Sequence, residues 1–138
     1  MPVSFPPNLN IGNYQASTNL LHNNTTEQTQ TDVVAYQKEK ETVMAYSGRF
    51  RVTWEMKRES QTGNTAYGKI YVNDVAVGTE RTTVSLTYVE VTAEDFQLKA
   101  GDLLQLYVHG AGASVPVVSV QNLKIKGTQM TDCVDQDP

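Results

Sequence analysis

The stretch GRFRVTWEMK, residues 48–57, decides the fold class of this chain. Every second position in it carries an apolar side chain and the positions between are polar or charged; the apolar ones are Phe50, Val52, Trp54 and Met56. Strict alternation over this length predicts a β-strand with one face in a core and the other in solvent.

The same period of two recurs further along the chain. Residues 66–72 and 104–109 alternate small or aliphatic side chains with polar or aromatic ones. Turn-forming residues separate these stretches, as at Asn73-Asp74 and around Gly101. The sequence therefore predicts an all-β chain, a single antiparallel β-sandwich or jelly-roll-like domain.

Charge is distributed unevenly and divides the chain into three parts. Residues 1–31 contain one charged side chain, Glu27, together with three prolines and six asparagines, which favour turns and extended backbone. Residues 128–138 contain three acids and no base, whereas the part between has eleven of each. We predict an extended N-terminal arm over residues 1–31, the β-sandwich domain over residues 32–127 and an acidic C-terminal tail over residues 128–138.

One segment of the predicted domain fits two structures. Residues 32–45 include the alternating charges KEKE at positions 38–41, and Thr31 or Asp32 could cap a short helix there. Alternating charge also protects the edge of a β-sheet from pairing with another chain. We favour an edge strand, with the helix as the alternative.

Composition excludes several classes of protein. The chain has 138 residues and a formal net charge of −4, which does not suit a nucleic-acid binder that needs a basic face. Its apolar runs are too short to span a membrane, and the first residues do not have the pattern of a signal peptide. Cys133 is the single cysteine, so it is either a free thiol or part of an intermolecular bond.

Catalytic and metal-binding patterns are not found in the sequence. There is no Gly-x-Ser-x-Gly motif, and the two histidines, His22 and His109, are far from each other and from Cys133. No spacing of ligands typical of zinc or calcium occurs. The sequence therefore predicts a protein that is not an enzyme, with no cofactor and no metal, and both histidines are interpreted as exposed polar side chains.

Aromatic side chains are the feature that stands out. Tyr67, Tyr71 and Tyr107 alternate out of phase with the apolar positions, which places them on the outer face of their strands. Tyrosine supplies a large contact area at low entropic cost and is enriched at interfaces. These residues are expected to line a glycan site or a subunit contact, unless the second face of the sandwich or the folded-back arm covers them. In the arm, the predicted partner contacts are Phe5, Leu9, Ile11 and Tyr14.

Several segments between residues 46 and 126 resemble a β-sandwich module of tailed-phage and prophage structural proteins. The segments that carry the resemblance are SGRFRV (47–52), AYGKIYVN (66–73), VGTERT (77–82), AGDLLQLY (100–107) and VQNLKI (120–125). Modules of this kind occur on capsid-decorating, tail and fibre proteins. The resemblance implies no catalytic residues.

The leading functional hypothesis follows from this resemblance. It describes a non-enzymatic virion structural protein, assembled in the host cytoplasm, that decorates and stabilises a capsid through its N-terminal arm, or forms part of a tail or fibre. Its partners would be other virion proteins, and a homo-oligomer such as a trimer is compatible with the sequence. The alternative hypothesis is a carbohydrate-binding module for host-surface recognition, which rests on the outward-facing tyrosines.

Overall fold

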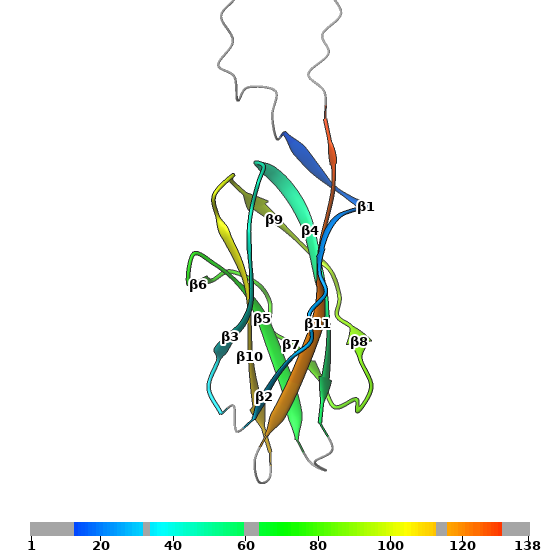
Figure 1. The fold of residues 1–138 in the computed structure, drawn as a ribbon, viewed down its shortest axis with the longest axis vertical. Coiled ribbons are helices and arrows are strands. Elements are labelled where there is room, and N and C mark those ends of the chain that lie inside the picture. Colours follow the sequence, from blue (N-terminus) through cyan, green and yellow to red (C-terminus); the bar gives the residue numbers. More distant parts are fainter. Residues whose placement is uncertain (1–12, 32–33, 60–63, 113–115, 131–138) are drawn as a thin grey trace, which may run out of the picture.

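The computed structural model describes residues 13–31, 34–59, 64–112 and 116–130, and these form eleven β-strands with no helix among them. Figure 1 looks along the edge of a sandwich of two sheets. The strands are β1 (Tyr14–Asn24), β2 (Gln28–Thr31), β3 (Gln37–Val43), β4 (Gly48–Arg58), β5 (Thr65–Val72), β6 (Val75–Ala76), β7 (Arg81–Thr83), β8 (Val89–Glu90), β9 (Glu94–Leu98), β10 (Leu103–Ala111) and β11 (Val117–Gln129). The predicted all-β sandwich is confirmed.

The first sheet has six strands and is built around the long pair β4 and β11. Strands β1 and β2 pair with successive parts of β11, while β8 and β9 pair with successive parts of β4. These ladders are antiparallel, and one parallel bridge joins Tyr14 to Gly48. Strand β1 therefore begins beside the end of β11, so the described chain starts and finishes at the same end of the sandwich, the upper end in Figure 1.

The second sheet has five strands in the order β3-β10-β5-β6, with β7 also paired to β5. Strand β3 confirms the strand predicted for residues 32–45, and it lies at the edge of this sheet as expected. Asn73 and Asp74 have φ values of 51° and 69°, the left-handed conformations of a two-residue hairpin turn between β5 and β6. Next to this hairpin, Val77 and Gly78 both donate hydrogen bonds to the Ile70 carbonyl, so the regular pairing with β5 is interrupted there.

The core lies between the sheets and follows the alternation in the sequence. The four apolar side chains of β4 that define the pattern are at most 2% exposed. They pack with the inward-facing residues of the other long strands, which include Ile70, Leu104, Leu106, Val108, Val120 and Leu123, each at most 1% exposed. Burial of this apolar surface is the main stabilising contribution to the fold.

The N-terminal boundary differs from the predicted one. Residues 14–31 were expected in an extended arm, yet β1 and β2 are strands of the six-stranded sheet. The physical reason is that their partner is remote: Tyr14 pairs with Gln129 and Thr31 with Val117. Residues 1–12 and 131–138, which include the rest of the predicted arm and tail, lie outside the described residues.

Membrane insertion through a helix has no support in the described part of the chain. None of its segments forms a helix long and apolar enough to cross a bilayer.

Candidate functional site

The outer face of the five-stranded sheet carries the predicted tyrosines. In β5, Ala66, Gly68 and Ile70 point into the core, so Tyr67 and Tyr71 point outward. The register of β5 and β10 places Tyr67 opposite His109 and Tyr71 opposite Gln105, and Tyr107 lies between these two pairs, opposite Lys69. Residues directly opposite each other share a face of the sheet, so the three tyrosines predicted from the sequence lie together on one surface, each half-buried.

Five rings on this face touch in a continuous series, which we call the aromatic row. Tyr71 stacks on Tyr107 with ring centroids 3.7 Å apart, and Tyr67 stacks on His109 at 4.3 Å. Tyr36 joins the two pairs, because its ring centroid is 4.4 Å from that of His109 and 6.2 Å from that of Tyr71. The row runs along the strands from Tyr67 to Tyr71, four residue steps or about 13 Å of extended chain.

Tyr36 is held in place by groups from two other segments, Glu80 and Lys69. It immediately precedes β3, and its hydroxyl donates a hydrogen bond to the Glu80 carboxylate. The Lys69 ammonium lies 5.0 Å from the centroid of its ring, within the range of a cation–π contact. Burial, reinforced by the bond to Glu80, holds the pKa of Tyr36 far above its ordinary value.

Polar side chains border the row beside Tyr107. Gln105 is fully buried, and its amide nitrogen donates to Glu41 and to Asp74, at 2.8 Å each. Its amide oxygen accepts from the backbone N–H of Asp74 at 2.8 Å, and Lys38 donates to Glu41 at 2.9 Å. The bonds from Gln105 and Lys38 lower the pKa of Glu41, which keeps this carboxylate ionised. The border therefore offers fixed acceptors and an ammonium group next to an aromatic surface.

The turn that carries Asp74 is anchored from the neighbouring β9–β10 connection. Asn73 accepts a hydrogen bond from the Leu103 N–H at 2.9 Å and donates to Asp102 at 3.1 Å. Asp102 also accepts from the Lys99 N–H at 2.8 Å. These bonds, first the one from Lys99 and then the one from Asn73, lower the pKa of Asp102. Asp74 is thus positioned by a network that depends on an ionised carboxylate.

We expect Asp102→Ala to lower the free energy of unfolding by about 1 kcal/mol at neutral pH, a modest value because the group is partly exposed. Since the folded state lowers the pKa of Asp102, its stabilisation is present above the ordinary aspartate pKa and is lost as pH falls through the folded-state pKa. Urea unfolding of both proteins at neutral pH and at about pH 2 measures this. A stability difference that stays equal at the two pH values would contradict the assignment.

Metal chemistry has no assembled site among the described residues. No group of three His, Cys, Asp or Glu side chains gathers in that part of the chain. Of the carboxylates beside the row, Glu41 and Asp74 are bridged by the Gln105 amide, and Glu80 accepts from the Tyr36 hydroxyl. The site is therefore suited to binding through ring contacts and hydrogen bonds.

Two members of the row were missed in the sequence analysis. His109 was interpreted as an exposed polar side chain, but it is half-buried with its ring parallel to Tyr67, and its Nε2 lies 3.6 Å from Glu80. The period of two in β10 could have identified it, because residues 105, 107 and 109 share a face. Tyr36 lies outside any alternating stretch, and its place depends on the path of the chain between β2 and β3.

The remaining predicted contacts do not join this site. Tyr14 is 7% exposed and packs in the core of its own domain, with ring centroids 5.3 Å from Phe50 and 5.2 Å from Tyr46. Its prediction as an arm residue reaching a partner is therefore corrected. Phe5, Leu9 and Ile11 lie outside the described residues.

Comparison with known proteins gives a likeness in architecture. No protein-family model and no curated protein sequence matches the chain. Among solved structures, it is similar to the CBM22-1 xylan-binding domain of Xyn10C from Paenibacillus barcinonensis, with 13% identity, 85% of this chain and 99% of that one covered, and a TM-score of 0.48. It is also similar to a CBM35 from Paenibacillus barcinonensis, with 15% identity, 78% and 98% coverage, and a TM-score of 0.45.

Proposed function

We propose that this protein is a non-catalytic glycan-binding module whose ligand lies on the aromatic row. The observation that carries the proposal is the continuous contact of five rings on the outer face of one sheet. A sugar ring has an apolar face of C–H groups and a rim of hydroxyls. Aromatic rings with polar tips, bordered by fixed acceptors and donors, complement both parts of such a ligand.

The shape of the site favours an oligosaccharide over a single sugar. The row extends about 13 Å along the strands, and it lies on a sheet face rather than in a closed cavity. Tyr36 and Tyr107 present hydroxyls at different points along it, and Lys69 adds an ammonium group between the two stacked pairs. Contacts spaced in this way are made by successive units of an extended chain.

Titration of the isotope-labelled protein with a panel of neutral, acidic and amino-sugar oligosaccharides tests the proposal by NMR. We expect at least one ligand to shift amide resonances in β3, β5 and β10 in a saturable way, with little change in β2, β8 and β11 of the opposite sheet. Shifts confined to the six-stranded sheet, or no response to any member of the panel, would contradict the proposal.

The predicted virion location, with capsid or tail proteins as partners, stays a prediction. So does the predicted homo-oligomer. A glycan-binding domain displayed on a virion would be compatible with both the leading and the alternative hypothesis drawn from the sequence.

A further inference from the structure

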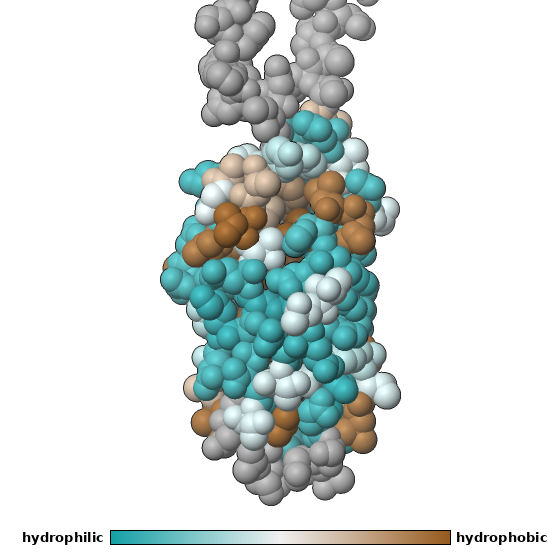
Figure 2. Space-filling view, viewed as in Figure 1, coloured by the Kyte–Doolittle hydropathy of each residue, from teal (hydrophilic) through white to brown (hydrophobic). Residues whose placement is uncertain are grey.

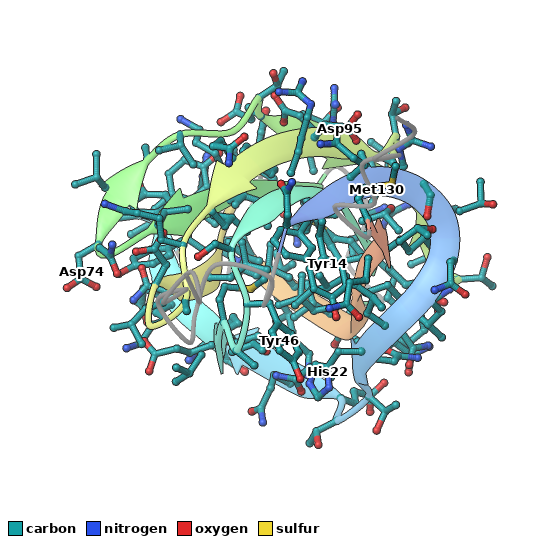
Figure 3. The ribbon with its side chains drawn as sticks, turned by 90° about the horizontal axis from the view of Figure 1, so that it is seen from above. Tyr14, His22, Tyr46, Asp74, Asp95 and Met130 are labelled. Carbon is teal, nitrogen blue, oxygen red and sulfur yellow. The ribbon has the colours of Figure 1, made fainter. Side chains whose placement is uncertain are left out.

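A second surface feature lies at the upper end of the sandwich and shares no residue with the aromatic row. It is a pocket of about 250 Å³ between β1 and the connection from β3 to β4. Its lining is largely apolar and consists of Tyr14, Leu21, His22, Thr42, Val43, Met44, Ala45, Tyr46, Phe50 and Ile125. Figure 3 shows Tyr14, Tyr46 and His22 close together in the view from above, well away from Asp74 beside the aromatic row.

Several walls of this pocket are apolar side chains left in contact with water. Leu21 is 40% exposed, Tyr46 is 42% exposed and Val43 is 61% exposed, and the neighbouring Leu20 is 51% exposed. Figure 2 shows apolar side chains gathered toward this end of the molecule, whereas the middle of the same face is polar. An apolar patch around a pocket is typical of a surface that another apolar group covers.

The segment nearest to this pocket in the sequence has the matching chemistry. Residues 1–12 have no charged side chain and lead directly, through Asn13, into Tyr14, which forms one wall. Ile11 is three residues from Tyr14 and Leu9 is five, so extended backbone can carry them about 10 Å and 17 Å from it. Gly12-Asn13 is a dipeptide that favours reversal of the chain.

We propose that residues 1–12 of the same chain cover this pocket, with Leu9 and Ile11 as the side chains that enter it. Attachment through so short a linker gives the segment an effective concentration in the millimolar range at its own pocket. A second copy of the chain at ordinary protein concentrations does not compete with that. The pocket is thus the docking site of the N-terminal segment, and the domain extends beyond the described strands to include it.

Methionine methyl groups provide a direct test in the full-length protein. Met44 lines the pocket and is 5% exposed, whereas Met56 is fully buried in the core and serves as an internal control. In protein labelled at methionine methyl groups, replacing both Leu9 and Ile11 by serine is expected to shift the Met44 resonance and leave that of Met56 in place. The matched control is Val3→Ser, an apolar residue of the same segment that we expect to leave Met44 unchanged.

Two further measurements decide whether the contact is made within one chain. A synthetic peptide of residues 1–12, added at millimolar concentration to the double variant, is expected to return the Met44 resonance toward its original position. In the unmodified protein, the chemical shift of the Met44 methyl group is expected to be the same at protein concentrations from micromolar to millimolar. An unchanged Met44 in the double variant, no response to the peptide, or a shift that depends on protein concentration would each overturn the proposal; the last would assign the pocket to a second copy.

Discussion

Replacing Tyr71 and Tyr107 together by alanine is expected to weaken glycan binding at least ~30-fold. Ring stacking on a ligand is typically worth about 1–3 kcal/mol for each aromatic side chain, and two such losses multiply in the dissociation constant. Tyr71 also contacts Tyr36, so its removal leaves the middle of the aromatic row without support on one side. Calorimetric titration with the best ligand from the NMR panel measures the change.

The same double variant is expected to remain folded, because both rings lie on the outer face of the sheet and not in the core. Urea unfolding of the variant checks this. Tyr88→Ala is the matched control: Tyr88 is a half-buried tyrosine that precedes β8 of the other sheet, where the Lys57 ammonium lies 4.7 Å from its ring centroid. Its loss should leave the affinity unchanged. Unchanged binding in the double variant, or equal loss in the control, would remove the basis for placing the ligand on the aromatic row.

Local alternation predicted much of the fold because each long strand has one face in the core. The stretch from Gly48 to Arg58 and the strand from Thr65 to Val72 both follow the period of two seen in the sequence. The same period placed Tyr67, Tyr71 and Tyr107 on the outer surface before any pairing was known. For these elements the physical cause of the sequence pattern, burial of every second side chain, is the cause of the structure as well.

Strand β1 was not predictable in this way. Its register with β11 shifts between Gln15 and Leu20, and again between Leu20 and His22, so no sustained alternation is left in its sequence. Its paired residues in β11 lie from 99 to 115 positions away in the sequence, and a pairing of that kind leaves no local signal. A polar strand without periodicity therefore looked like an arm, although it completes the six-stranded sheet.

The aromatic row was predictable only in part for a related reason. Three of its members come from alternating strands, and the fourth, His109, follows the same alternation but was judged by its residue type alone. Tyr36 reaches the face through hydrogen bonding to Glu80, which is forty-four residues away in the sequence. A contact between two connections outside the regular strands depends on the completed fold, and no spacing in the sequence encodes it.

The largest effect on stability is expected from Gly48→Ala, with a loss of roughly 4 kcal/mol or more in the free energy of unfolding. Gly48 has a φ of +144° where β4 begins beside β1. A Cβ atom there would lie 2.3 Å from the backbone nitrogen and 2.5 Å from the carbonyl oxygen of Tyr14, so the two backbones would have to separate. Because Tyr14 packs on Phe50, that movement would also open the upper end of the core.

Gly101→Ala separates this steric cost from the cost of backbone conformation. Gly101 also has a positive φ, +93°, but a Cβ atom there would have nothing within 4 Å. Its replacement should therefore cost only about 1–2 kcal/mol from the left-handed conformation. Urea unfolding of both variants gives the comparison, and a loss at Gly48 no larger than at Gly101 would show that β1 and β4 are not held this closely. Because the aromatic row lies on the other sheet, a Gly48→Ala protein that still folds should keep its affinity for the glycan. Its Met44 methyl resonance should shift from the position that it has in the unmodified protein, where residues 1–12 cover the pocket.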